Sequence, residues 1–219
     1  MLAWHFLSED KRLGYDDGRL VEVGQTLECK GDPALCSNGM HGSVRLIDAV
    51  YYANGPIACR VEIDGDVIEG EDKLCGRRRT VLWMLDATRL LHEFACTCAE
   101  DALALVEQPD ERSVEAIAAK RKWLRGEITD KELDSAWVAA WDAALGAASW
   151  AAAWAASRDD ALAAAEDASR AAAWATAGAI AEATAEAAAA RAAARDAARA
   201  KQNERLTAMV MEAHEKEGE

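Results

Sequence analysis

The chain has 219 residues and a formal net charge of -14 at neutral pH. This length suits one large domain or two small ones whose cores need no disulfide bonds. The acidic charge disfavours unassisted binding to nucleic-acid phosphates or to an anionic membrane, so the composition predicts a partner with a basic surface, without direct nucleic-acid or membrane binding.

The sequence shows no secretion signal, and no alanine tract supplies the ~20 apolar residues that span a bilayer. We therefore expect a cytoplasmic protein in the cytosol of a host cell. In that compartment cysteines stay reduced rather than forming disulfides. The six cysteines are Cys29, Cys36, Cys59, Cys75, Cys96 and Cys98.

Short strands and turns are expected in the first part of the chain. Apolar and polar residues alternate over residues 20–29 and predict a half-buried strand, with a bulge or bend at Gly24. A glycine-containing loop follows, and Ser43 is expected to cap a short helix over residues 44–53.

A hairpin is predicted immediately after this helix. Residues 57–63 and 66–69 are both rich in β-forming side chains, and Asp64 and Gly65 separate them. Such a two-residue linker is a strong signal for a β-hairpin. A basic run, Arg77 to Arg79, then precedes an apolar stretch.

The pattern changes to a helical period at residue 86. Apolar residues recur there at intervals of three and four, which predicts an amphipathic helix. A second helix is predicted over residues 113–125. Thr129 and Glu132 have the spacing of a capping box, so a third helix should begin near Asp130.

Alanine dominates the chain beyond this point, with interruptions at Gly146 and Gly178. Four tryptophans of this region form two pairs, and the members of each pair are four positions apart in the sequence: Trp137 with Trp141, and Trp150 with Trp154. On one straight helix the two pairs would lie on different sides, which would leave one pair in water. The sequence therefore predicts a helical hairpin or bundle bent near either glycine, or an oligomer.

Further candidate interaction residues follow the tryptophan pairs. Trp174 is a fifth aromatic candidate, and Arg191, Arg195 and Arg199 share one helical face. Glu182 and Glu186 precede these arginines, so the segment could complement another helix or form a solvated face with weak ion pairs.

These elements together predict an α+β fold. A small mixed α/β domain is expected over residues 1–85, followed by a helical domain over residues 86–219. The helical domain divides into residues 86–128 and the alanine- and tryptophan-rich helical hairpin or bundle over residues 129–219.

Chemical motifs are sparse. His41 lies between glycines and is a candidate ligand-binding residue, although it could equally be a turn histidine bonded to a nearby carbonyl. Cys29 and Cys36 with His41 match no zinc pattern, while His92 and Cys96 favour core packing over metal binding. Because no phosphate loop, dinucleotide fingerprint or nucleophile elbow occurs, no catalytic residue, metal or cofactor is predicted.

Several segments resemble an uncharacterised N-terminal domain found in bacteriophage and prophage proteins, where it precedes helices rich in alanine, arginine and tryptophan. The similar segments are WHFL at 4–7, LCSNGMHGS at 35–43, DAVYYANGP at 48–56, CRVEIDG at 59–65, GEDKL at 70–74 and AKQNERL at 200–206. The resemblance implies a phage or prophage origin and no particular activity.

Two segments of the helical region resemble helical proteins described as immunity proteins. They are EFACTCAEDAL at 93–103 and PDERSVEAIAAKRKWLRGEIT at 109–129. This resemblance implies a binder that neutralises another protein.

A third resemblance is to part of the ADP-ribosyltransferase fold. It rests on Gly39, His41, Ser43, Ala49, Tyr52 and the run VEIDG at 61–65. It implies binding of NAD or a related nucleotide by His41, Ser43 and Tyr52, with His5 on the first strand. That strand lacks the His-Gly-Ser/Thr triplet of the fold and no catalytic glutamate can be placed, so the resemblance implies binding without catalysis.

The leading prediction is a non-enzymatic, phage- or prophage-encoded binding protein. It would inhibit a host defence system, such as a CRISPR or other nucleic-acid-binding complex, or neutralise a toxin through an acidic surface. The alternatives are an ADP-ribosyltransferase-like domain that binds a nucleotide, and a structural protein that forms homo-oligomers through its helical half.

Overall fold

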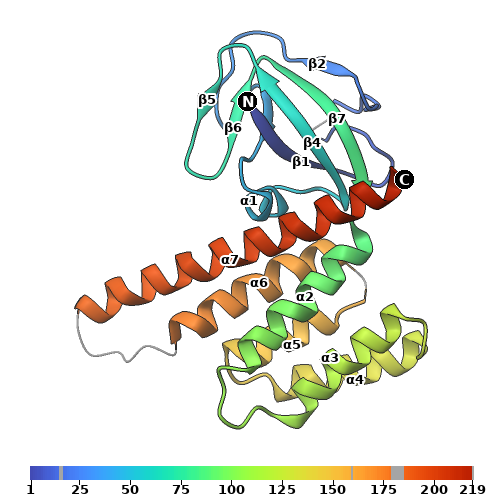
Figure 1. The fold of residues 1–219 in the computed structure, drawn as a ribbon, viewed down its shortest axis with the longest axis vertical. Coiled ribbons are helices and arrows are strands. Elements are labelled where there is room, and N and C mark those ends of the chain that lie inside the picture. Colours follow the sequence, from blue (N-terminus) through green and yellow to red (C-terminus); the bar gives the residue numbers. More distant parts are fainter. Residues whose placement is uncertain (15–16, 159, 179–184, 219) are drawn as a thin grey trace. The chain divides into compact units, whose positions relative to one another are not determined.

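A computed structural model describes residues 1–14, 17–158, 160–178 and 185–218, and the side chains of residues 185–187 lie outside the description. The chain folds as two compact units (Figure 1). Unit 1 comprises Met1–Thr88 together with Leu206–Glu219, and unit 2 comprises Arg89–Arg205. The fold is α+β, because the strands lie in the first part of the chain and most of the helices follow.

Two antiparallel sheets form most of unit 1. The first sheet has the strand order β1 (Leu2–Leu7), β4 (Ile57–Asp64), β7 (Arg78–Asp86) and β2 (Thr26–Glu28). The second has the order β3 (Met40–Gly42), β6 (Leu74–Gly76) and β5 (Ile68–Glu69). One short helix, α1 (Leu46–Tyr51), connects β3 to β4.

A hydrophobic cluster in unit 1 contains buried side chains from both sheets. Strand β4 contributes Cys59, Val61 and Ile63 to it at every second position, as expected of a strand with one buried face. The second sheet contributes Met40 and Leu74 to the same cluster. Burial of these apolar side chains, at ~25 cal/mol per Å², is the main stabilising term of the unit.

The C-terminal turns of the chain contribute to unit 1 through one aromatic side chain. His214 stacks on Trp83 of β7, with ring centroids 4.0 Å apart and an interplanar angle of 11°. Trp83 in turn meets Trp4 of β1 edge-on at 5.5 Å, and the guanidinium of Arg60 lies 4.6 Å from the centroid of the Trp4 ring. Residues from β1, β4, β7 and the end of the last helix therefore meet in one cluster of aromatic contacts.

Six helices account for unit 2 and the end of the chain. They are α2 (Thr88–Leu103), α3 (Glu111–Leu124), α4 (Asp130–Ala143), α5 (Ala147–Ala156), α6 (Ala161–Gly178) and α7 (Ala185–Glu217). Helices α3, α4 and α5 pack on one another, and α5 packs on α6. Helix α7 passes from unit 2 into unit 1 at Leu206. Within the described ranges, none of the helices has both the length and the apolar character needed to cross a bilayer.

Local capping explains where several helices begin. The Asp110 carboxylate accepts a hydrogen bond from the backbone of Arg112 at the start of α3. Thr129 and Glu132 form the predicted capping box, and α4 begins at Asp130 as expected. The predicted interruptions are confirmed, because Gly146 is the N-cap of α5 and α6 ends at Gly178.

Two local predictions for the first part of the chain are wrong, although the bend predicted at Gly24 is confirmed. The strand predicted over residues 20–29 shortens to β2, since the chain bends at Gly24, whose φ is +81°. Ser43 caps no helix: its backbone exchanges hydrogen bonds with that of Trp4, and Arg45 is the N-cap of α1. Tertiary pairing with β1 therefore overrides the local capping signal.

The hairpin predicted at Asp64 and Gly65 is also wrong. The turn exists, with φ values of +70° at Gly65 and +51° at Asp66. However, β4 pairs with β1 and β7, whereas β5 pairs with β6 in the second sheet. The turn thus transfers the chain from one sheet to the other instead of closing a hairpin.

Candidate functional site

The bend at Gly146 brings the two tryptophan pairs of unit 2 together. Trp141 of α4 meets Trp150 of α5 edge-on with ring centroids 4.8 Å apart, and it meets Trp154 edge-on at 5.5 Å. Trp137 lies 5.9 Å from Trp141. Edge-to-face contacts at these distances are favourable aromatic geometries. The sequence prediction of a helical hairpin or bundle bent near this glycine is therefore confirmed.

Small side chains lie beneath these indoles. Ala116 of α3, Ala140 of α4, and Ala153 and Ala156 of α5 form a buried cluster, against which Trp137 packs. Alanine permits close approach of helices but buries little area, so the indoles supply much of the apolar contact. The indole nitrogen of Trp137 is buried without a hydrogen-bond acceptor among the described residues.

Part of the aromatic cluster faces water. Trp141 and Trp150 are 38% and 37% exposed, and Val138 is 49% exposed. Leu145, in the connection between α4 and α5, is 96% exposed. We call Trp137, Val138, Trp141, Leu145, Trp150 and Trp154 the tryptophan surface.

The tryptophan surface has an acidic border. Helix α5 has no charged residue, and Asp142 of α4 is exposed beside Trp141. Near the start of α4, Asp130 and Asp134 pair with Arg158 at 3.3 and 3.2 Å, so these two carboxylates are partly neutralised. Asp142 lies near the other end of α4 and is close enough to Arg112 of α3 to interact with it electrostatically.

The remaining predicted interaction residues lie on α6 and α7. The guanidinium of Arg195 is 4.8 Å from the centroid of Trp174, which gives a cation–π contact within unit 2. Arg191 and Arg199 are half-buried on the same helix as Arg195. Glu182 lies outside the described residues, as does the side chain of Glu186. The predicted arginine-bearing face of α7 therefore includes one residue, Arg195, that stacks on a tryptophan.

The ligand-binding residues predicted in unit 1 fall into two groups. In the first, His41 lies on β3, and its Nδ1 donates to the Gly39 carbonyl oxygen at 2.9 Å, as a turn histidine would. His5 lies on β1, close enough that a charge on His41 would lower its pKa. Ser43 is buried, and its backbone is bound to Trp4, the neighbour of His5.

Tyr52 belongs to the second group. It follows α1, and its hydroxyl donates to the Asp72 carboxylate at 2.5 Å. The Lys73 amine lies 4.2 Å from the centroid of the Tyr52 ring. Burial raises the pKa of the phenol, and the hydrogen bond to Asp72 acts in the same direction. The structure therefore joins Tyr52 to the GEDKL segment, and no hydrogen bond or ring contact among the described residues connects it to His5 or His41.

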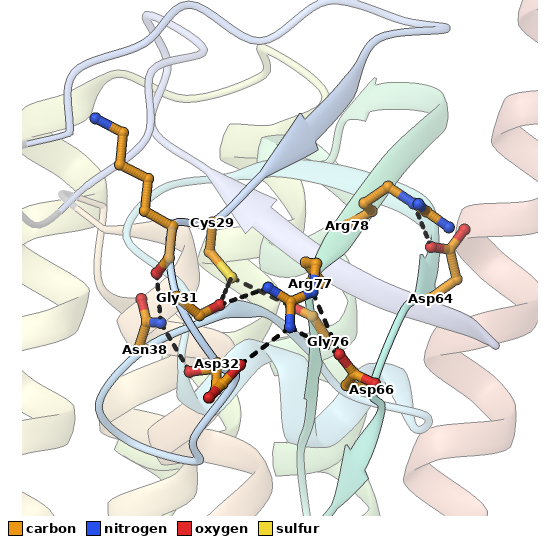
Figure 2. A network of polar contacts seen from close by, with 10 residues as sticks. Cys29, Gly31, Asp32, Asn38, Asp64, Asp66, Gly76, Arg77 and Arg78 are labelled. Atoms are coloured by element: carbon orange, nitrogen blue, oxygen red, sulfur yellow. Dashed lines mark hydrogen bonds and ion pairs between the residues drawn. The ribbon is translucent and has the colours of Figure 1, made fainter.

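A polar network fixes the loop before His41 (Figure 2). The Arg77 guanidinium donates to the Gly31 carbonyl at 2.9 Å and to the carboxylates of Asp32 and Asp66 at 3.2 and 2.8 Å. The Asn38 amide donates to the Asp32 carbonyl at 2.9 Å. These contacts fix the conformation of the loop between β2 and β3, immediately before the strand that carries His41.

Residues 1–93 match one family model. It is described as a domain of unknown function, DUF7666. The DUF7666 match includes both sheets, α1 and the beginning of α2, and it covers all four residues of the predicted ligand site. No curated protein and no solved structure matches the chain. The resemblance to ADP-ribosyltransferases therefore stays a prediction.

Sequence reasoning missed Val138 and Leu145 as members of the tryptophan surface. Val138 is three residues from Trp141 and shares its side of α4, so helical spacing could have identified it. Leu145 precedes Gly146, and its exposure depends on where α4 ends at Ala143. Residue spacing alone does not indicate that α4 ends at Ala143.

Proposed function

We propose that this protein acts by binding another protein through the tryptophan surface of α4 and α5. The observation that carries the proposal is the exposure of Leu145, Trp141 and Trp150 side by side at one bend. Large contiguous apolar patches mark sites of protein association. Tryptophan is, in addition, among the residues that contribute most to binding energy at interfaces.

Leu145 does little for the stability of the free protein, because its side chain is 96% exposed. The packing of α3, α4 and α5 depends instead on the alanine cluster and the indoles. Covering an apolar side chain of this size supplies ~1.5–3 kcal/mol. A partner that covers Leu145 and the outer edges of the indoles would gain this energy.

Charge favours a basic partner. The chain has a net charge of -14, and Asp142 borders the tryptophan surface. A protein with an apolar centre and a basic rim would therefore be attracted over a distance and then bind by apolar contact. Attraction of this kind weakens as salt is added.

Two sequence resemblances support a narrower proposal. The phage-like N-terminal segments and the immunity-like segments favour a phage- or prophage-encoded inhibitor that acts in the host cytosol. Its target would be a basic component of a defence complex, or a toxin. The match to DUF7666 is consistent with this proposal and assigns it no activity.

The test compares two variants that make the same change of charge. Leu145→Asp places a carboxylate in the tryptophan surface, while Val114→Asp does so at an exposed valine of α3, a helix that contributes no residue to this surface. Each full-length variant is expressed in hosts that carry defined defence systems or toxins. The readouts are phage survival or cell survival, followed by the affinity for the protected component.

We expect Leu145→Asp to weaken binding about tenfold or more and to abolish protection, because loss of a hot-spot residue costs more than 1 kcal/mol. Val114→Asp should behave as the unmodified protein does. Absence of protection by the unmodified protein in every host would contradict the proposal. Light scattering that shows an oligomer dispersed by Leu145→Asp alone would instead assign the tryptophan surface to self-association.

A further inference from the structure

Arg79 carries a charge into the interior of unit 1. It lies on β7 and is only 3% exposed. Its partners across the sheet, Leu27 of β2 and Ile63 of β4, both belong to the hydrophobic cluster. The side chain therefore leaves the sheet on its buried face, and Nη1 donates to the His41 carbonyl oxygen at 2.7 Å.

The Arg79 guanidinium forms no ion pair among the described residues, and its Nε is buried without an acceptor. Asp17 is close enough to affect Arg79, but Arg19 already binds both Asp17 oxygens at 2.6 and 2.7 Å. Because burial disfavours the charged form, the pKa of Arg79 falls to about 10, so the side chain is still cationic at neutral pH. A buried charge without a partner is strongly unfavourable.

Two imidazole rings accompany this cation. His41 Nε2 is buried without a hydrogen-bond partner. The ring of His5 forms no hydrogen bond within the part of the chain that the structure describes. Burial lowers the pKa of both histidines, and the charge of Arg79 lowers each of them further. As whole residues, both histidines are partly exposed, whereas Arg79 is buried.

Charges of both signs act on these residues. Lys73 acts on His41 as a positive charge, whereas Arg79 is affected by Arg19 and, in the opposite sense, by Asp17. The thiol of Cys59, which also affects Arg79, cannot serve as the anion, because burial raises its pKa to about 12. A guanidinium nitrogen without an acceptor and an imidazole nitrogen without a partner thus belong to two residues, Arg79 and His41, that one hydrogen bond joins.

We propose that Arg79, His41 and His5 form a binding site for a phosphate group. A guanidinium presents N–H donors in a fork that matches the oxygens of a tetrahedral oxyanion. Because His41 Nδ1 already donates to the Gly39 carbonyl, Nε2 can donate to a ligand only when the ring is protonated, and a bound anion favours the protonated form of both rings. The inference goes beyond the proposed function, since it concerns unit 1 and does not depend on the tryptophan surface.

The test titrates the full-length protein with inorganic phosphate at constant ionic strength, with chloride and acetate as reference anions. Calorimetry should detect phosphate binding that exceeds binding of the reference anions. Ligand at about a hundred times Kd should raise the melting temperature of unit 1 by roughly 10–20 °C. Parallel titrations with AMP and NAD distinguish free phosphate from a nucleotide phosphate, according to which binds more tightly.

Arg79→Met is the decisive variant, and Arg78→Met is its matched control. Arg78 is the neighbouring residue of β7, but it is exposed and paired with Asp64 at 2.6 Å. We expect Arg79→Met to abolish phosphate binding and to melt at or above the temperature of the unliganded protein, because it removes an unpaired buried charge. Arg78→Met should bind phosphate normally.

A second variant covers the case in which Arg79→Met fails to fold. Arg79→Lys keeps the charge and loses the fork, so phosphate binding should weaken by about tenfold or more. The proposal is overturned if phosphate binds no better than chloride, or if Arg79→Lys and Arg78→Met bind phosphate equally well.

Discussion

At the scale of single residues, unit 2 has its own buried polar group. Lys120 of α3 is fully buried, donates to the Ser157 carbonyl oxygen at 2.6 Å and lies 4.1 Å from the centroid of Trp123. His92 of α2 is also buried and meets Trp123 edge-on at 5.7 Å. Burial, followed by the charge of Lys120, lowers the pKa of His92 to about 4. His92 is therefore neutral in the folded protein at neutral pH.

The free energy of unfolding should therefore depend on pH through His92. An unfolded histidine titrates near its ordinary pKa of 6.5, whereas folded His92 titrates near 4. The unfolded chain thus binds the extra proton between these values, so stability is complete above pH ~6.5 and decreases as the pH falls toward 4. The loss should approach roughly 3 kcal/mol at the lower limit.

Urea denaturation at a series of pH values tests this expectation. His92→Leu removes the titrating group, and the difference between the two profiles isolates its effect from that of the carboxylates. The variant should show a flatter profile between pH 4 and 6.5. Parallel profiles would show that His92 titrates normally in the folded protein.

Residue types and spacings predicted part of these sites. Their spacing of four residues would allow His92 and Cys96 to share a metal, but core packing was the favoured prediction, and both residues are buried. The sequence left two alternatives for His41: ligand binding, or a turn histidine bonded to a nearby carbonyl. The structure contains the hydrogen bond of the second alternative. Arg79 escaped detection, since arginine is almost always at the surface and its burial follows from pairing with Leu27 and Ile63.

At the scale of elements, local signals predicted the helices better than the strands. The capping box at Thr129 and the interruption at Gly146 involve neighbours in sequence, so the chain specifies them locally. Strand β3 pairs with β6, whose residues lie far along the chain, and nothing around His41 encodes that partner. The hairpin prediction failed for the same reason.

Gly76 shows how closely one element of the second sheet approaches the first. A Cβ atom at this position of β6 would lie 2.7 Å from the Asp64 carbonyl oxygen and 2.7 Å from the Ile63 side chain. Gly76→Ala should therefore lower the free energy of unfolding by ~2 kcal/mol, because the backbone must move to relieve the contact. Urea denaturation measures the change.

Gly178→Ala is the appropriate comparison for Gly76→Ala. Gly178 ends α6, and a Cβ atom there would meet no heavy atom within 4 Å. Its replacement should leave stability unchanged or raise it slightly, since alanine favours helix. Equal effects of the two substitutions would mean that β6 does not lie so close to β4.

At the scale of the whole molecule, the chain enters unit 1 twice. Residues 1–88 and 206–219 belong to it, although the sequence predicted a single boundary after residue 85. A composition that changes at one point cannot reveal that a distant helical end returns. The α+β fold class was predictable from the periodicities, whereas this return depends on tertiary contacts such as the stack of His214 on Trp83.

Removing residues 206–219 should lower the melting temperature of unit 1 and leave Trp83 more exposed to water. The reason is loss of a ring stacked 4.0 Å from the indole. His214→Ala removes that ring alone and should cost ~1 kcal/mol, which is typical of an aromatic pair. Thermal denaturation followed by tryptophan fluorescence measures both changes.

Lys216→Ala provides the reference for the shortened chain. Lys216 pairs only with Glu212 on an exposed part of α7, at 2.7 Å, so its loss should change stability very little. If the shortened chain melts at the temperature of the intact protein, the C-terminal turns contribute nothing to unit 1.

The two separate segments of unit 1 also impose an order on biosynthesis. During translation, residues 89–205 are synthesised before residues 206–219. The inserted unit can therefore fold while translation continues, as domains generally do. Until residues 206–219 emerge, unit 1 lacks the ring of His214 on Trp83, so this face of the indole stays uncovered in the nascent chain.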